Sequence, residues 1–236
     1  MTHILLGGSG RLGKHFLATY SDWLAPSHEE IDITDKHAVA RYFTVHKPQV
    51  VIHAAAVVGR NEAASDRQLA IQVNVEGTAN IAKACLRFGA RLVYISSVAV
   101  FDGKKGEYTE EDTPNPVYFY GWTKYAGEQA VGMLDNAVIV RTDFFVPGAS
   151  KYTAAFTDHF CSKMPVRSLI TALAVIANSS YTGVLHVGLR RDTLYNMLLP
   201  YNSDLRGITI AESSMPDFPK DLSLNIARFE SFIQLY

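Results

Sequence analysis

The sequence predicts an α/β fold of the Rossmann type, a doubly wound parallel sheet with a small C-terminal lobe. Short apolar segments alternate along the chain with longer stretches of helical periodicity. The strand segments are apolar on both faces, as expected for a parallel sheet that helices cover on both sides. A glycine-rich turn also lies between the first apolar segment and the first helical stretch, which is the usual context of a phosphate-binding turn.

The predicted elements alternate in the order expected for such a fold. Strands are expected at six apolar segments, residues 3–6, 23–25, 50–53, 92–96, 138–142 and 183–187. Helices are expected at residues 11–20, 35–46, 66–88, 119–133, 153–163 and 168–178. Thr34 or Asp35 can cap the second helix. Asn74 lies among apolar helix positions and is expected to be buried and bonded to backbone. Because ligands bind beyond the carboxyl ends of parallel strands, residues that end or follow strands should meet at one edge.

The first turn repeats glycine at every third position, as Gly7, Gly10 and Gly13. The glycines allow a tight turn and close approach to a pyrophosphate, while the helix N-terminus supplies free N–H groups. A glycine-rich turn without a ligand is the alternative, and the strand–turn–helix context favours ligand binding over it. We therefore expect a dinucleotide here, contacted by Gly7, Ser9, Gly10, Arg11, Leu12 and Gly13.

The segment after the second predicted strand bears on the choice of cofactor. An acidic residue there commonly holds the ribose hydroxyls of NAD, but Ala25 is followed by Pro26, Ser27 and His28. A carboxylate would repel a 2′-phosphate, whereas Ser27 and His28 could bond one, so the segment favours NADP(H) over NAD(H). Arg11 is a further candidate for that phosphate, with a solvent-exposed helix start as the equally weighted alternative.

Two further segments are expected to contact the cofactor. Small residues after the third predicted strand, Ala54, Ala55 and Ala56, suit close approach of a flat ring, and helix–strand packing explains them equally well. Asp32 and Ile33 are expected near the adenine.

Composition indicates which cellular compartment and which classes of binding partner to expect. The chain has 236 residues, 48% of them hydrophobic, which is enough for a substantial core. A net charge of −1 with interspersed signs argues against nucleic-acid or anionic-membrane partners. No apolar stretch is long enough to span a bilayer, and the N-terminus begins with a strand rather than a signal peptide. Cys85 and Cys161 are too few for a disulfide scaffold and lack metal-ligand spacing. We expect a cytoplasmic protein without a metal site.

Three polar side chains are spaced for proton-coupled carbonyl chemistry. Tyr120 and Lys124 lie four residues apart in a predicted helix, so their side chains share one face. A nearby ammonium favours the ionised form of a phenol, which predicts a tyrosine that exchanges a proton near neutral pH. Ser97 ends a predicted strand, where its hydroxyl could polarise the carbonyl that receives a hydride.

These motifs resemble the extended short-chain dehydrogenase/reductase superfamily, which pairs such a glycine turn with Tyr-x-x-x-Lys. Five segments resemble dTDP-4-dehydrorhamnose reductases, at residues 30–35, 94–103, 108–114, 120–128 and 140–142. The resemblance implies that Tyr120 donates the proton, Lys124 holds the nicotinamide ribose and Ser97 bonds the substrate carbonyl. It also implies an NAD(P)-binding domain over residues 1–148 and a reduced substrate-binding lobe over residues 149–236, interleaved with the last sheet strands.

Three departures from that family concern the substrate. Val98 and Ala99 replace polar residues after Ser97, the segment between residues 147 and 168 is short, and Phe218-Pro219 stands where Arg-Pro is expected. Arg190 and Arg191 could replace the missing arginine, or be simply solvated.

A second resemblance, at residues 53–61, is to the 3,5-epimerase/4-reductases that make UDP-rhamnose. It implies that Arg60 and Asn61 face a sugar nucleotide, and a polar loop after a strand is the alternative.

The leading interpretation is an NAD(P)H-dependent reductase, or reductase/epimerase, of a nucleotide-linked 4-keto-6-deoxy sugar. The expected partner is that nucleotide sugar, with a homodimer left open. Two alternatives remain. One is a regulatory subunit without turnover, like the methionine adenosyltransferase β subunit, which has similar motifs. The other is a nucleotide-sugar epimerase, for which very tight NAD retention would be expected.

Overall fold

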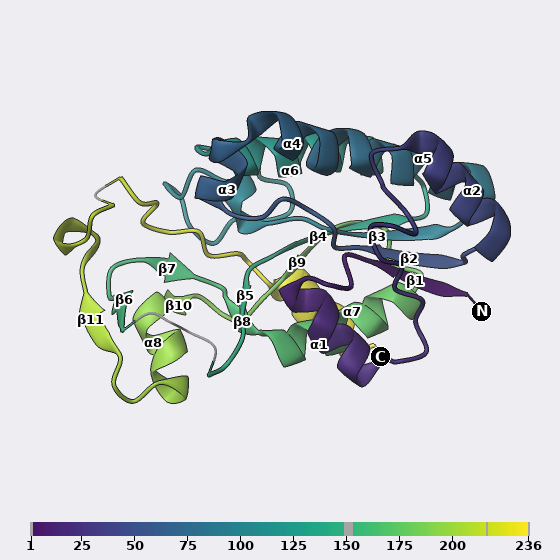
Figure 1. Cartoon of the computed structure of the whole chain (residues 1–236). Coiled ribbons are helices and arrows are strands. Elements are labelled where there is room, and N and C mark those ends of the chain that lie inside the picture. The colour runs from purple at the N-terminus through teal and green to yellow at the C-terminus, as the bar shows by residue number, and fades with distance from the viewer. Residues whose placement is uncertain (1, 149–152, 216, 236) are drawn as a thin grey trace.

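A five-stranded parallel sheet forms the centre of the molecule (Figure 1), in the order β1-β2-β3-β4-β9. The computed structural model describes residues 2–148, 153–215 and 217–235. The strands are β1 (His3–Leu6), β2 (Val50–His53), β3 (Arg91–Ile95), β4 (Ala137–Thr142) and β9 (Gly183–Val187). Every residue of β2, β3 and β4 is buried, which explains their continuous apolar runs. The α/β Rossmann-type prediction is confirmed.

The predicted strand at residues 23–25 is reduced to a single bridge. Leu24 pairs with Ile4 on the free side of β1, through one hydrogen bond on each side of the bridge. Pro26 follows and has no N–H to donate, so the pairing stops there. The chain then crosses β1 to reach β2 on the other side. This reversal is the topological switch point at which ligands of such sheets bind.

Helices cover both faces of the sheet (Figure 1). One face carries α2 (Lys36–His46), α5 (Thr78–Phe88) and α6 (Phe119–Val131), and the other carries α1 (Arg11–Thr19) and α7 (Val166–Asn178). Helix α5 shows why these helices form. It buries Ile81, Ala82 and Cys85 on one stripe and ends at Gly89 in the left-handed region. Asp35 caps α2 by accepting the His37 N–H at 2.8 Å, as predicted.

The long helix predicted at residues 66–88 consists of three consecutive segments. They are α4 (Arg67–Ile71), a π-helical turn (Gln72–Gly77) and α5. Asn74 lies in the π-helical turn, fully buried. Its amide accepts the Val57 N–H at 2.8 Å and donates to the Val57 carbonyl at 3.0 Å and to Thr123 Oγ1 at 2.9 Å. The expected backbone bonding of Asn74 is confirmed, and it attaches the helix layer to the segment after β2.

The C-terminal lobe corrects one predicted element. Residues 153–163 do not form a helix but contain β6 (Ala154–Phe156) and β7 (Phe160–Cys161). The two strands pair with β11 (Arg206–Ile208) and β10 (Asp192–Thr193), so partners far along the chain override the local preference. The remaining elements are β5 (Phe144–Phe145), β8 (Met164–Pro165), α3 (Arg60–Ser65), α8 (Leu194–Leu198) and α9 (Ala227–Ile233).

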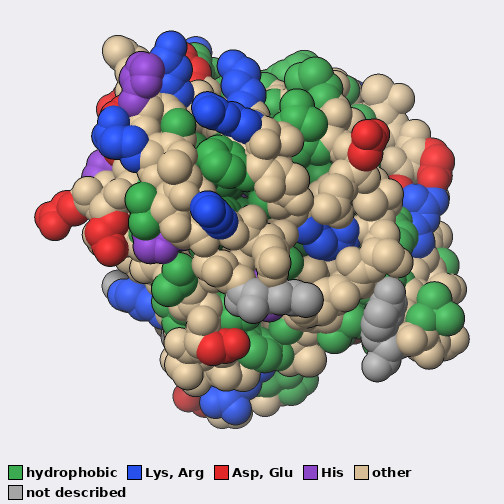
Figure 2. All heavy atoms as spheres, turned by 90° about the vertical axis from the view of Figure 1, so that its right-hand side faces the viewer, with side chains coloured by type: hydrophobic (Ala, Val, Ile, Leu, Met, Phe, Trp, Pro, Cys, Tyr) green, Lys and Arg blue, Asp and Glu red, His purple; other side chains and the backbone are tan. Residues whose placement is uncertain are grey.

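The surface shows mixed charge. On the face drawn in Figure 2, basic and acidic side chains alternate with apolar ones. Both cysteines are buried and unbridged. In the part of the chain that the structure describes, every helix is too short or too polar to cross a bilayer.

Candidate active site

A cavity of about 960 Å³ lies beyond the carboxyl ends of β1 to β4. All the residues predicted to contact cofactor or to act in catalysis line it, and so does Arg60. The exception among the predicted site residues is Asn61, which is exposed on α3 and does not line the cavity. The topology therefore brings the glycine turn, the small residues after β2, Ser97 and the Tyr-x-x-x-Lys pair to one place.

The glycine turn is closely packed against its neighbours. Gly7 has a φ of 90°, and a Cβ there would lie 2.6 Å from the Ala55 nitrogen. A Cβ on Gly13 would lie 2.3 Å from the Gly7 carbonyl oxygen. Gly10 N-caps α1, whose first residues line the cavity. Their unbonded N–H groups suit a pyrophosphate, so the turn has the shape that the proposed cofactor needs.

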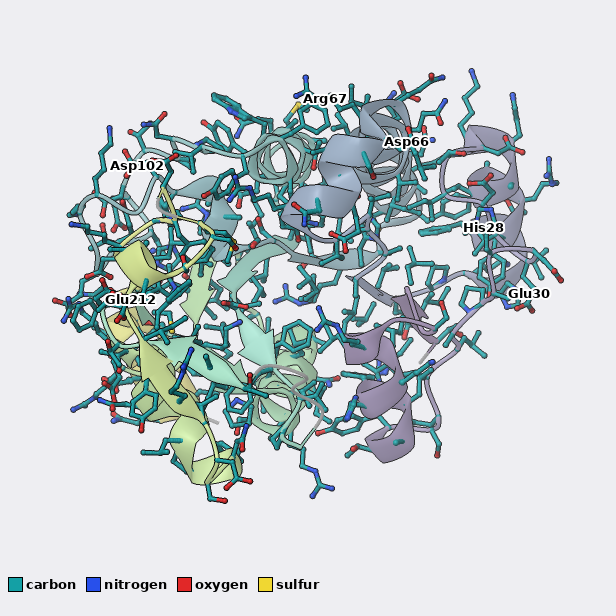
Figure 3. The ribbon with its side chains drawn as sticks, turned by 60° about the vertical axis from the view of Figure 1, so that its left-hand side comes forward. His28, Glu30, Asp66, Arg67, Asp102 and Glu212 are labelled. Carbon is teal, nitrogen blue, oxygen red and sulfur yellow. The ribbon has the colours of Figure 1, made fainter. Side chains whose placement is uncertain are left out.

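A carboxylate lies beside the predicted 2′-phosphate residues. Glu30 folds back so that its side chain accepts the Ser27 N–H at 2.7 Å, and this bond lowers the pKa of the Glu30 carboxyl. His28 Nε2 lies 3.9 Å from Asp32 Oδ2. Figure 3 shows His28 and Glu30 on the segment leading into α2, far from Glu212 in the C-terminal lobe. No acid directly follows Ala25, as the sequence indicated, but Glu30 places a carboxylate beside Ser27.

Arg11 lies at the catalytic end of the cavity. Its guanidinium carbon is 6.0 Å from the centre of the Phe144 ring. Its positive charge acts on Tyr120, lowering the pKa of the phenol. These neighbours do not support the interpretation of Arg11 as a ligand of the 2′-phosphate.

Ser97 and Tyr120 both line the cavity, and the Ser97 hydroxyl lowers the pKa of the Tyr120 phenol. Ser97 follows β3, and its hydroxyl also accepts the Ala99 N–H at 3.2 Å. Tyr120 lies in the first turn of α6. Burial raises the pKa of Tyr120 to about 12, although Ser97 and Arg11 oppose the shift. The prediction that Lys124 lowers the pKa of the Tyr120 phenol is therefore wrong for the protein by itself. The phenol keeps its proton at neutral pH, as a proton donor must.

Lys124 is buried beside the ring of Tyr94. Its ammonium lies 4.1 Å from the Tyr94 ring centroid. Burial lowers the pKa of Lys124 to about 7, and the Glu128 carboxylate partly opposes this shift. Near neutral pH, Lys124 therefore changes between its charged and neutral forms.

The stability of the protein should reveal the titration of Lys124. A lysine exposed in an unfolded chain has a pKa of 10.5, whereas the pKa of Lys124 in the folded chain is about 7. Between these values the unfolded chain binds a proton that the folded chain lacks, so the free energy of unfolding rises with pH. From pH 7 to 9 we expect the wild-type protein to gain about 2 kcal/mol relative to Lys124→Met, measured by urea titration. Equal changes in both proteins would show that buried Lys124 keeps its proton.

Arg60 and Tyr118, which both line the cavity, contact each other. The guanidinium stacks on the Tyr118 ring at 4.2 Å and donates to its hydroxyl at 3.3 Å. That hydroxyl donates to the Asp217 carbonyl at 3.4 Å, so the C-terminal segment joins the contact. Arg190 and Arg191 do not line the cavity. They pair with Glu230 and Asp221 at 2.9 and 2.8 Å, so they do not replace the missing arginine.

Asp143, Phe144 and Phe218 are among the cavity residues that sequence reasoning missed. Asp143 and Phe144 follow β4, and the rule that ligands bind beyond strand ends could have identified them. Phe218 reaches the cavity from the C-terminal segment and packs edge-on against His159 at 4.9 Å. The sequence marks Phe218 only as a departure from the family's Arg-Pro pair.

Comparison with known proteins agrees with this geometry. A family model described as the RmlD substrate binding domain matches residues 1–186. The chain is 35% identical to methionine adenosyltransferase 2 subunit beta of Bos taurus, over 97% of this chain and 81% of that protein. The match to the same subunit of Rattus norvegicus is 37% identical but covers only 54% of this chain and 42% of that protein.

Further matches include reductases. The chain is 30% identical to dTDP-4-dehydrorhamnose reductase of Streptomyces griseus, over 86% of this chain and 76% of that protein. The crystal structure of the Bacillus anthracis dTDP-4-dehydrorhamnose reductase in complex with NADP superposes with a TM-score of 0.86 at 25% identity, covering 98% and 92% of the two chains. The resemblance drawn from the sequence motifs is thereby confirmed.

Proposed function

The chain belongs to the RmlD substrate binding domain family, and from this premise we propose that it is an NAD(P)H-dependent reductase of a nucleotide-linked 4-keto-6-deoxy sugar. The observation that carries the proposal is the convergence of Ser97, Tyr120 and Lys124 on the cavity that contains the glycine turn. The Bacillus anthracis relative binds NADP, which supports a nicotinamide cofactor here.

The residues present fit a nicotinamide cofactor and a ketone. The glycine turn would hold the pyrophosphate, and Lys124 the nicotinamide ribose. The bound cofactor supplies the hydride that forms the new C–H bond. Ser97 donates a hydrogen bond to the carbonyl oxygen as negative charge develops on it, and Tyr120 delivers its proton to that oxygen. The carbonyl thus becomes an alcohol, and the tyrosinate is reprotonated from solvent.

The direct test is a panel of UDP-, dTDP- and GDP-linked 4-keto-6-deoxy sugars, with the loss of NADPH and NADH absorbance as the readout. We expect turnover with at least one member. Cofactor binding without turnover of any member would favour the second candidate, a regulatory subunit. The match to the bovine subunit over 97% of the chain supports that candidate. So does the substrate lobe, where Arg190 and Arg191 are paired away from the cavity.

We propose NADPH as the preferred cofactor, with Ser27 and His28 at the 2′-phosphate. A carboxylate near that phosphate repels it, so Ser27→Asp is expected to shift the ratio of the two dissociation constants about five- to tenfold toward NADH. Glu30→Gln removes the carboxylate already there and should shift the ratio toward NADPH. Nicotinamide fluorescence measures both constants. Tighter NADH binding by the wild-type protein, unchanged in both variants, would contradict this assignment.

The Arg60–Tyr118 contact is proposed to bind the phosphates of the substrate. Tyr118→Leu removes the ring on which the guanidinium stacks, an interaction worth about 0.5–2 kcal/mol. We expect KM for the nucleotide sugar to rise about threefold to tenfold, with kcat changed less. Trp122→Leu on the same helix is the control, because Trp122 is exposed and does not line the cavity. If Tyr118→Leu leaves KM unchanged, Arg60 does not bind the phosphates of the substrate.

A further inference from the structure

Glu128 and Arg141 form a buried ion pair behind the catalytic residues. Their side chains are 2% and 5% exposed, and neither lines the cavity. Arg141 donates to Glu128 through Nη2 at 2.8 Å and through Nε at 3.0 Å. Charges are rarely buried this deeply without a compensating role, since desolvation opposes the gain from pairing.

The Glu128 carboxylate connects the two elements that carry the catalytic groups. Glu128 lies four residues after Lys124 on α6, and therefore on the same face of the helix. Its Oε1 also accepts the hydroxyl of Ser96 at 2.5 Å. Ser96 directly precedes Ser97, whose hydroxyl lowers the pKa of Tyr120. One carboxylate thus joins the end of β3 to the helix that carries Tyr120 and Lys124.

Arg141 is held in place from the other side. Its guanidinium lies 5.2 Å from the Phe101 ring centroid and 3.5 Å from His186 Nε2. His186 Nδ1 lies 2.9 Å from the Tyr108 carbonyl, so Nδ1 donates and Nε2 is left to accept from Arg141. Burial lowers the pKa of His186 to about 3, which keeps this imidazole neutral. The arrangement therefore holds the Arg141 guanidinium between Glu128 and His186.

We propose that Glu128 is a positioning residue for the reaction. It holds the Ser97 backbone against Tyr120 and supplies the negative charge that faces the Lys124 ammonium. The inference rests on the proposed function, because it assigns Lys124 to the nicotinamide ribose.

Three other titratable groups face Lys124, and each is uncharged at neutral pH. Tyr94 faces it from β3, His53 from β2 and Tyr120 from its own helix. Burial raises the pKa values of both tyrosines, and burial together with Lys124 lowers the pKa of His53 to about 3. Among the described groups that act on the pKa of Lys124, Glu128 supplies the charge that favours its protonated form.

The test is the pH dependence of NADPH binding in Glu128→Gln, followed by nicotinamide fluorescence. In the wild-type protein, affinity should fall as pH rises and Lys124 loses its proton. In the variant we expect this fall to occur roughly one pH unit lower, because the facing negative charge is gone. If Glu128 had only a structural role, the variant would bind NADPH more weakly, but its affinity would fall at the same pH as in the wild-type protein. A folded variant with the wild-type pH dependence would overturn the inference.

Two more variants keep the test decisive if Glu128→Gln does not fold. Glu128→Asp keeps the charge, so the fall in NADPH affinity should stay at the wild-type pH. Ser96→Ala keeps the ion pair but cuts the bond to β3, and kcat should fall about threefold or more with NADPH affinity unchanged. The inference would be overturned if the NADPH affinity of Glu128→Asp fell at a different pH from that of the wild-type protein, or if Ser96→Ala kept the wild-type kcat. Failure of the wild-type protein to bind either cofactor would instead overturn the proposed function, and this inference with it.

Discussion

Replacing Tyr120 by Phe is expected to lower kcat for carbonyl reduction by about 10²–10⁴-fold, the usual contribution of general acid catalysis. Burial raises the pKa of the phenol to about 12, so wild-type Tyr120 carries the proton that the product oxygen needs. The Phe ring fills the same space but has no proton to give. NADPH affinity should therefore stay close to the wild-type value. Steady-state kinetics with the substrate found in the sugar panel, together with nicotinamide fluorescence, measures both quantities.

Tyr125→Phe is the matched control for this experiment. Tyr125 lies on the same helix but packs against the core cluster around Phe101 and does not line the cavity. We expect its kcat to stay near the wild-type value. Near-normal activity in Tyr120→Phe would instead locate the proton donor elsewhere, and Tyr118, the other tyrosine that lines the cavity among the described residues, would then be tested.

Replacing Arg141 by Met is expected to lower the free energy of unfolding by about 3–5 kcal/mol, because it leaves the Glu128 carboxylate buried without its partner. Met fills much of the same volume beside Phe101, so the loss reports the uncompensated charge rather than a cavity. Urea denaturation followed by circular dichroism measures this free energy.

Two controls separate charge from packing. Arg190→Met breaks a surface pair in which the arginine side chain is 84% exposed, and it should change stability by less than about 1 kcal/mol. The double variant Glu128→Gln, Arg141→Met leaves no buried charge and should recover much of the loss. A single Arg141→Met variant as stable as the wild-type protein would show that water or rearrangement compensates Glu128.

Much of the fold and of the candidate site could be predicted from the sequence. The strands of the central sheet, the glycine turn and the Tyr120–Lys124 pair were all placed correctly along the chain. Each depends on neighbours within a few positions, through the period of the apolar residues, the turn geometry or the i, i+4 spacing. The parallel sheet then requires that strand ends converge, which brings Ser97 to the same cavity.

Other features arise only when distant segments pack. Residues 153–163 form strands because their partners are β10 and β11. Phe218 enters the cavity, and Arg191 turns away from it to Asp221, through contacts far apart in the sequence.

The protonation state of the site is decided in the same way. The local pairing of Tyr120 with Lys124 predicted a lowered phenol pKa, yet burial raises it to about 12 and lowers that of Lys124 to about 7. Spacing along a helix determines which groups can meet. The free energy of a charge also depends on every element that removes water from it, and on partners such as Glu128 and Arg141 that only the folded chain brings together.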